Sequence, residues 1–177
     1  MKYKVLPPQD YLLECFDYNP ITGEVFWKQR PQNHFKNIRS CNIWNSRYPH
    51  TIAGGQNGAH HRTRINKTDF ITSRIIWKLI TGQEPTSLID HADTNFLNNQ
   101  WANLRKADQS QNRHNSHMQP RNKTGYKGVR KSGEKFTAYI SIAKHRKYLG
   151  TFETAEKAHL AYCRQVDIIF KEFARYE

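Results

Sequence analysis

LIDHADTNFLNNQWANLRKADQSQNRHN, residues 88–115, is the most informative stretch of the sequence. It is rich in asparagine, aspartate and histidine, whereas its apolar residues are few and scattered. A packed core is not built from such residues, because buried amides and imidazoles without partners cost free energy. The stretch is not simple low-complexity disorder either, since five apolar residues can anchor it: Ile89, Phe96, Leu97, Trp101 and Leu104. The question is which chemistry needs Asp90 beside His91, followed by Asn103 and Asn112.

The same stretch predicts a strand, a loop, a second strand and a helix. SLIDH is a short apolar run that turns polar, as at a strand end, and DTNFLNNQW indicates a long loop. ANLRKA is expected to be a second short strand or turn. DQSQNRHNS suits a short polar helix for which Asp108 is the N-cap.

A core helix is expected upstream, over residues 70–81. Its apolar residues recur at helical spacing, and Gly82 follows directly after its end. The residues that carry this spacing are Ile75, Ile76, Leu79 and Ile80. Arg74 and Lys78 are expected on the exposed face of the helix.

Residues before this helix give weaker signals. NPITG indicates a turn before a short β-rich run, Glu24 to Lys28. Residues 31–60 are polar and are expected to form loops and short strands with no resolvable order. HRTRINKTDF is expected to form a further strand or hairpin arm. The four tryptophans are expected to pack in the interior: Trp27, Trp44, Trp77 and Trp101.

A second, smaller unit is predicted at the C-terminal end. GYKGVR and KHRKYLGTF indicate strands, and KFTAYISIA between them alternates apolar and polar residues. TAEKAHLAYCRQVDIIFKEF indicates a helix for which Thr154 is the N-cap. Its apolar stripe consists of Ala158, Ala161, Tyr162, Val166, Ile169 and Phe170. Three antiparallel strands covered by one helix are expected, so the predicted fold class is α+β.

One face of this predicted sheet is left without a helix. It carries basic and aromatic side chains together: Arg130, Tyr139, Ser141, Arg146 and Tyr148. Such a mixture suits DNA phosphates and base edges, and an ordinary solvated sheet face is the alternative. The polar and basic residues 113–124 indicate a linker between the two units.

The charge of the chain points to a polyanionic partner. Lys and Arg number 28 against 15 Asp and Glu, which gives a formal net charge of +13. Residues 1–112 carry 14 basic and 9 acidic residues, and residues 113–177 carry 14 and 6, so the excess is larger in the shorter part. Nucleic acid is the first candidate, and a soluble protein with a basic isoelectric point is the alternative.

The three cysteines exclude two classes of site. Cys15, Cys41 and Cys163 lie far apart and form no CxxC pair, so neither a zinc ribbon nor a disulfide framework is expected. The N-terminal residues lack the apolar run of a signal peptide, and no membrane span is expected. A reducing cytoplasm suits this composition.

Hydrolysis of a phosphodiester bond is a reaction that the polar residues of segment 88–115 could catalyse. The reaction needs an activated water, neutralised charge at phosphorus and a stabilised leaving oxygen. One imidazole can be the base, and carboxylate and amide oxygens are suitable ligands for Mg²⁺. His91 precedes Asn103 by 12 residues, and Asn103 precedes Asn112 by 9.

This spacing resembles the HNH endonuclease family, with its ββα-metal fold. The matching segments are IDH at 89–91, NNQWANLR at 98–105 and SQNRHN at 110–115, and the spacing is similar to that of the phage homing branch. RIIWKLITGQEP upstream resembles the helix and turn that precede the motif there, and DYNPITGEVFWK is similar to the start of many phage members.

The resemblance implies a role for each site residue. His91 is the general base, Asp90 and Asn112 bind one divalent metal ion, and Asn103 orients His91 by a hydrogen bond. Asn112 stands where the family name implies a second histidine, which favours Mg²⁺ or Mn²⁺ over Zn²⁺. Structural zinc is not expected. Other histidines are expected to be solvated, in the linker or on DNA: His60, His61, His114 and His117.

The C-terminal unit has a resemblance of its own. GYKGVR, KFTAYISI and KYLGTFETAEKAHLAY are similar to the Apetala-type, ethylene-response-factor DNA-binding domain, which lays its sheet in the major groove. By this resemblance Lys127 joins the five residues of the free sheet face, and Tyr162 reaches a phosphate from the helix. Arg74 and Arg105 complete the predicted DNA-binding set. The predicted domains are 1–112 for the nuclease with a β-rich extension, 113–124 for the linker and 125–177 for the DNA reader.

Together these features predict a site-specific DNA endonuclease of homing character that nicks or cuts double-stranded DNA. The alternatives are a catalytically silent DNA-binding regulator and a restriction-like nuclease of relaxed specificity. If the protein is phage-encoded, we expect it in the cytoplasm of a bacterial host cell. Monomer or homodimer, nicking or double-strand cutting, the target site and the role of residues 31–60 stay open.

Overall fold

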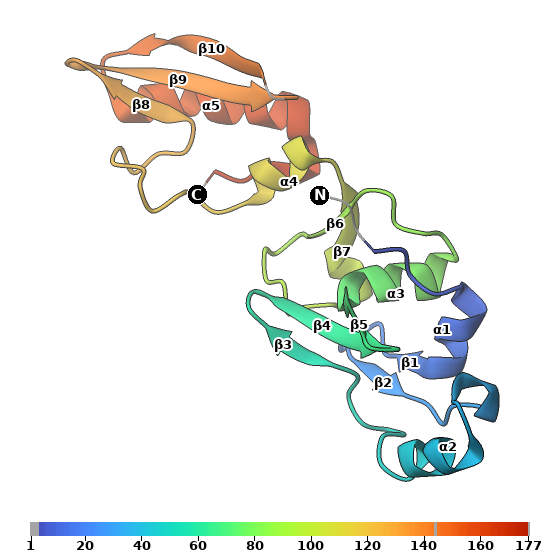
Figure 1. The fold of residues 1–177 in the computed structure, drawn as a ribbon. Coiled ribbons are helices and arrows are strands. Elements are labelled where there is room, and N and C mark those ends of the chain that lie inside the picture. Colours follow the sequence, from blue (N-terminus) through green and yellow to red (C-terminus); the bar gives the residue numbers. More distant parts are fainter. Residues whose placement is uncertain (1–3, 144, 177) are drawn as a thin grey trace. The chain divides into compact units, whose positions relative to one another are not determined.

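The chain consists of two compact units, Met1–Lys106 and Ala107–Glu177, in a computed structural model that describes residues 4–143 and 145–176. Each unit combines helices with small sheets, whose pairing is antiparallel, so the α+β class is confirmed (Figure 1). No helix in the described ranges is both long and apolar enough to span a membrane.

The first unit holds short helices and paired strands. In chain order these are α1 (Gln9–Cys15), β1 (Phe16–Tyr18), β2 (Val25–Trp27), η1 (Gln32–His34), α2 (Ile38–Asn45), β3 (Gly55–Asn57), β4 (His60–Ile65), β5 (Thr68–Ile71), α3 (Thr72–Thr81), β6 (Leu88–His91), η2 (Trp101–Asn103) and β7 (Leu104–Ala107). β1 pairs with β2, β3 and β5 flank β4, and β6 pairs with β7. The strand, loop, strand and helix order predicted for residues 88–115 is confirmed.

Helix α3 lies at the centre of the first unit's core. Ile75 and Ile76 are fully buried against a cluster that includes Leu12 and Ile65. The helix ends where predicted, since Gly82 has a left-handed φ of +73° and its N–H donates to the carbonyl of Lys78.

The expectation that Arg74 and Lys78 lie on the exposed face of α3 was wrong, because both are buried. The Arg74 guanidinium donates to the carbonyls of Pro85 and Ser87, and Lys78 Nζ forms a 2.8 Å salt bridge with Glu84. These contacts fasten the segment after α3 to the helix. A buried cation keeps its charge only with such partners, and the partners are not adjacent in sequence.

Residues 31–60 are more ordered than their composition suggests. They contain the α2 helix, where a loop was expected, and Asn37 caps it by accepting from the Ser40 N–H at 2.9 Å. The rings of Trp27 and Trp44 pack 5.1 Å apart, edge to face. The Arg30 guanidinium lies 5.0 Å from the Trp44 ring centre, so aromatic packing rather than an apolar stripe stabilises this part of the unit.

The β4–β5 hairpin confirms the prediction for HRTRINKTDF. Its turn residues, Asn66 and Lys67, both have positive φ, as a tight two-residue hairpin turn requires. The β2 strand likewise lies within the run predicted from Glu24 to Lys28.

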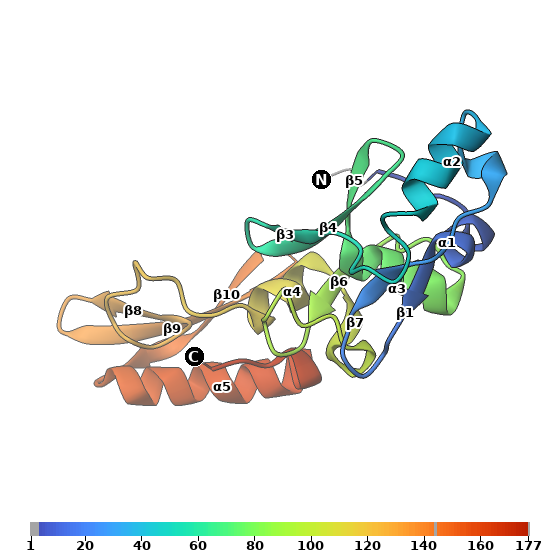
Figure 2. The ribbon, with the colours of Figure 1, turned by 90° about the horizontal axis from the view of Figure 1, so that it is seen from below.

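The second unit contains the predicted three-stranded sheet and its helix. Its elements are α4 (Gln109–Asn115), β8 (Val129–Ser132), β9 (Lys135–Ile142), β10 (His145–Phe152), α5 (Ala155–Phe170) and η3 (Lys171–Phe173). β9 is the central strand, and α5 covers one face of the sheet (Figure 2). Thr154 caps α5 by accepting from the Lys157 N–H, as predicted.

Helix α4 belongs to the second unit, whereas the sequence placed it at the end of the first domain. Asp108 and Gln111 form a capping box at its start. Near its end His114 is 5 % exposed, stacks on Phe170 at 3.8 Å and donates from Nε2 to the Ser141 carbonyl at 2.8 Å. The expectation of a solvated His114 was therefore wrong, and burial lowers the pKa of this imidazole below its usual value.

Candidate active site

Strand β6 ends in two buried polar residues, Asp90 and His91, which are 3 % and 2 % exposed. Arg105 on the paired strand β7 donates from Nε to Asp90 Oδ2 at 2.9 Å, which makes a salt bridge. A buried carboxylate is stable only with such a partner. Arg105 was predicted to bind DNA; in the structure its guanidinium is engaged with the predicted metal ligand.

The His91 ring is held by Asn99, which the sequence analysis did not single out. His91 Nε2 lies 3.1 Å from Asn99 Oδ1, and an amide oxygen can only accept a hydrogen bond. Nε2 therefore carries the proton in this arrangement, and Nδ1 is the basic nitrogen of the neutral ring. The only signal for Asn99 in the sequence was its place in the polar run NNQW.

The Phe96 ring packs against His91. The two rings are nearly perpendicular, with centres 5.7 Å apart, and Phe96 also packs against His60 at 4.9 Å. His60 was expected to be solvated, but burial and the nearby charge of Arg62 lower its pKa. The candidate base thus sits under a partly exposed ring from the loop that follows β6.

Asn103 organises this loop and does not bond to the His91 ring. Its Oδ1 accepts from the Asp93 N–H at 3.0 Å, and its Nδ2 donates to Asp93 Oδ1 at 2.9 Å and to the Asn98 carbonyl at 2.7 Å. Burial of Asp93 raises its pKa, but hydrogen bonds from Asn98, the Asn95 N–H and Asn103 outweigh this and lower it overall. The predicted contact from Asn103 to His91 was wrong, because Asn99 makes it.

We expect Asn103→Ala to destabilise the first unit by about 2–4 kcal/mol, since a buried amide and its three hydrogen bonds are lost. Urea unfolding followed by tryptophan fluorescence measures this, because all four tryptophans lie in the first unit. Asn42→Ala, at an exposed position of α2, is the matched control and should unfold like the wild type. Equal midpoints for the two variants would contradict the structural role of Asn103.

The fourth predicted site residue, Asn112, lies on α4 in the second unit and is partly exposed. Its backbone N–H donates to the Asp108 carbonyl in the first turn of the helix. Among the residues that the structure describes, no group of three or more His, Cys, Asp or Glu side chains could hold a metal ion. The metal roles of Asp90 and Asn112 stay predictions.

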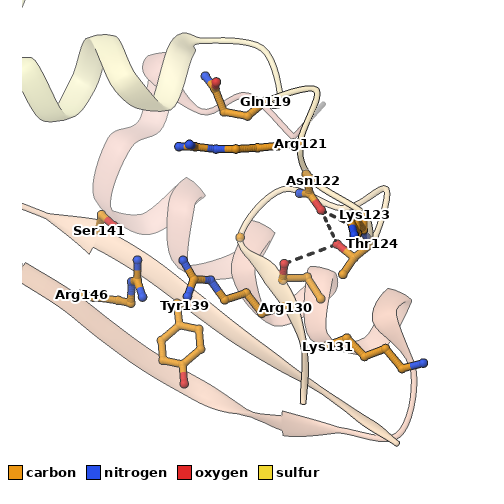
Figure 3. Close-up of a pocket in the computed structure, with 12 residues that line it drawn as sticks. Gln119, Arg121, Asn122, Lys123, Thr124, Arg130, Lys131, Tyr139, Ser141 and Arg146 are labelled. Carbon is orange, nitrogen blue, oxygen red and sulfur yellow. Dashed lines mark hydrogen bonds between the residues drawn. The ribbon is translucent and has the colours of Figure 1, made fainter. Parts of the chain in front are cut away.

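The outer face of the second unit's sheet brings five of the predicted DNA-binding residues together. The β9–β10 register pairs Ser141 with Arg146 and Tyr139 with Tyr148. The Arg146 guanidinium lies 5.6 Å from the Tyr139 ring centre, and the two tyrosine rings are 5.5 Å apart. Arg130 on β8 is exposed beside them, so this face presents cations and aromatic rings to solvent (Figure 3).

Two further residues of the predicted DNA-binding set are used inside the second unit. Lys127 Nζ donates to the carbonyls of His114 and Ser116 at 2.7 and 2.5 Å, near the end of α4. Burial and the nearby Arg175 lower the pKa of Lys127 to about 8. Tyr162, expected to reach a phosphate, is 2 % exposed, and its hydroxyl lies 3.3 Å from His114 Nδ1. The sequence could not separate these from the solvent-facing residues, because their partners lie elsewhere in the chain.

Residues 71–114 match the family model of the HNH endonuclease. The matched segment begins just before α3, ends in α4 and includes all four predicted site residues: Asp90, His91, Asn103 and Asn112. The match supports an HNH nuclease domain, and such a domain indicates a hydrolase that acts on DNA. No curated protein and no solved structure matches the chain.

Proposed function

We propose that the chain is a site-specific DNA endonuclease of homing character, in which the first unit contains the catalytic base and the second unit reads the DNA. The observation that carries the proposal is the pair Asp90 and His91, which ends β6 within the segment that matches the HNH endonuclease. The cationic and aromatic sheet face of the second unit supports DNA as the substrate.

In this proposal His91 takes the proton from the attacking water through Nδ1. Asn99 holds the ring through Nε2, so that the basic nitrogen keeps one orientation. Arg105 holds the Asp90 carboxylate in a salt bridge and fixes its direction at the strand end. Because His91 is 2 % exposed, Phe96 must move aside before water and a phosphate reach the ring.

The donor chemistry of the two predicted ligands suits a hard divalent cation. Asp90 offers a carboxylate oxygen and Asn112 an amide oxygen, and Mg²⁺ accepts few protein ligands because it keeps several waters. When bound, such an ion supplies charge neutralisation at the phosphate and at the leaving oxygen. The proposed ligands are oxygen atoms, which favour Mg²⁺ or Mn²⁺ over Zn²⁺. Cys15 and Cys41 are buried and supply no thiolate ligand to this proposed site.

Metal-dependent nicking tests the proposal. Supercoiled plasmid that carries the DNA flanking the gene is incubated with the purified chain and Mg²⁺, with and without EDTA. We expect nicked circles that disappear with EDTA, because each chain has one proposed active site; linear product would indicate paired active sites. A plasmid without the flanking DNA should be cut far more slowly, and equal cutting would favour a nuclease of relaxed specificity.

A chain that binds the plasmid but cuts nothing with Mg²⁺ or Mn²⁺ would sink the catalytic proposal. One observation favours that second function, a DNA-binding regulator: His91 is buried beneath Phe96. A variant that uncovers His91 distinguishes the nuclease from the regulator. Phe96→Ala should leave cleavage intact or raise it if the site is catalytic, and no variant at this position should create cleavage in a silent protein.

A further inference from the structure

The loop of residues 119–124, within the predicted linker, is folded onto the second unit. The Asn122 Nδ2 donates to the Tyr126 carbonyl at 2.8 Å, and its Oδ1 accepts from both the N–H and the hydroxyl of Thr124. The Thr124 hydroxyl also lies 3.4 Å from the carbonyl of Val129, at the start of β8. These bonds give the loop a defined place beside the sheet, which a flexible linker would not have.

This loop and the outer face of the sheet together line one groove of about 670 Å³. Loop residues form one wall, and residues of β8, β9 and β10 form the other (Figure 3). We call this the basic groove, because five of its lining residues are cationic and none is acidic. The five are Arg121, Lys123, Arg130, Lys131 and Arg146.

The cationic groups of the basic groove are not neutralised within the described part of the chain. All five residues are exposed, and no salt bridge is formed by any of them among the described residues. Other lysines of the unit do have partners: Lys135 pairs with Glu153 at 2.8 Å, and Lys127 donates to two carbonyls. Like charges gathered in one groove repel, so a polyanion that enters it gains attraction at every one of them.

The distribution of these charges favours an extended anion. In Figure 3 Arg121 extends from the loop above the sheet, Arg130 and Arg146 lie on the sheet below it, and Lys131 lies away from Arg146 on the far side of the groove. A single phosphate ion could contact only part of this set. A phosphodiester backbone presents one charge per nucleotide and can contact both walls along its length.

We propose that the basic groove receives the phosphate backbone of one strand of duplex DNA, with Arg121 and Lys123 as phosphate contacts on the loop wall. This inference rests on the proposed function. It adds phosphate contacts, which do not depend on DNA sequence, to the contacts made by the sheet. Arg130 and Arg146 on the sheet wall contact the same backbone, and with Tyr139 they also face the base edges beside it. Residues 119–124 thus belong to the DNA interface.

Duplex binding by the full chain in EDTA, measured by fluorescence anisotropy, tests this without cleavage. The variant Arg121→Ala/Lys123→Ala should lose affinity on the order of tenfold at low salt, for the target duplex and a scrambled duplex alike. The slope of log affinity against log salt should shrink by roughly two, one for each lost phosphate contact. Both residues are exposed, so the circular dichroism spectrum should match the wild type.

The control variant Lys157→Ala/Arg164→Ala removes the same charge from exposed positions on α5, which covers the other face of the sheet. It should leave the salt slope nearly unchanged. An equal loss of affinity in both variants would show that only net charge matters, and it would overturn the proposal that the groove binds the backbone. Wild-type affinity of the loop variant Arg121→Ala/Lys123→Ala would also overturn the proposal. If Arg130→Ala/Arg146→Ala lost binding in that case, the sheet would still bind DNA, but without a contribution from the loop. Failure of nicking in Mg²⁺ is a separate result and concerns the proposed catalytic residues, not the basic groove.

Discussion

Replacing His91 by asparagine is expected to slow DNA nicking by about 10²- to 10⁴-fold, which is the usual contribution of a general base. Asparagine keeps part of the ring's volume and can still bond to Asn99, but it cannot take a proton from water at neutral pH. The measurement is the initial rate at which supercoiled plasmid becomes nicked in Mg²⁺. Affinity for the target duplex in EDTA should not change, because His91 lies in the first unit, whereas the sheet face proposed to read DNA belongs to the second.

His50→Asn is the matched control for this variant. It makes the same chemical change at an exposed position of the first unit, where the φ of +64° suits asparagine. We expect this control to nick at the wild-type rate. If His91→Asn nicked as fast as the control, the base would have to be another group, and the proposed role of β6 would fail.

Gly128→Ala is expected to give the largest loss of stability in the second unit, about 3 kcal/mol or more. Gly128 has a φ of +78°, which costs an alanine roughly 1–2 kcal/mol. An added Cβ would also lie 2.1 Å from the ring of Tyr162, which is buried and cannot move aside without displacing its neighbours. Urea unfolding followed by far-UV circular dichroism measures the loss, because α5 and the sheet contribute to that signal.

Gly125→Ala separates the two causes. Gly125 has nearly the same φ, +72°, but a Cβ there would meet nothing within 4 Å. This control should lose only about 1–2 kcal/mol, from backbone strain alone. Equal losses at the two positions would show that the Tyr162 ring relaxes and that the packing beneath β8 is looser than the structure indicates.

Much of the local structure could be predicted because its signals act over a few residues. Asp108, Thr154 and Gly82 mark helix ends, and their hydrogen bonds join groups at most four positions apart. The alternation in β9 likewise needed only its own residues to be read. The spacing of Asp90, His91, Asn103 and Asn112 was also enough to find the segment that matches the HNH endonuclease.

Helix α2 was missed for a physical reason. Its segment is only eight residues long, which is shorter than the window in which helical periodicity becomes visible. Contacts with distant residues stabilise it instead: Cys41 Sγ and the Asn45 amide both donate to the Arg30 carbonyl, and Trp44 packs on Trp27. Such contacts cannot be read from composition within a short window.

By itself the sequence determined the fold class, the order of elements from β6 to α4, and the pair of polar residues at the end of β6. Only the tertiary structure decided which polar groups face solvent and which face one another. In the tertiary structure His91 contacts Asn99 rather than Asn103, and Arg74 and Tyr162 are buried. Lys127 points inward, towards backbone carbonyls. The reason is that capping and periodicity are local properties, whereas burial and pairing depend on residues far apart in the chain.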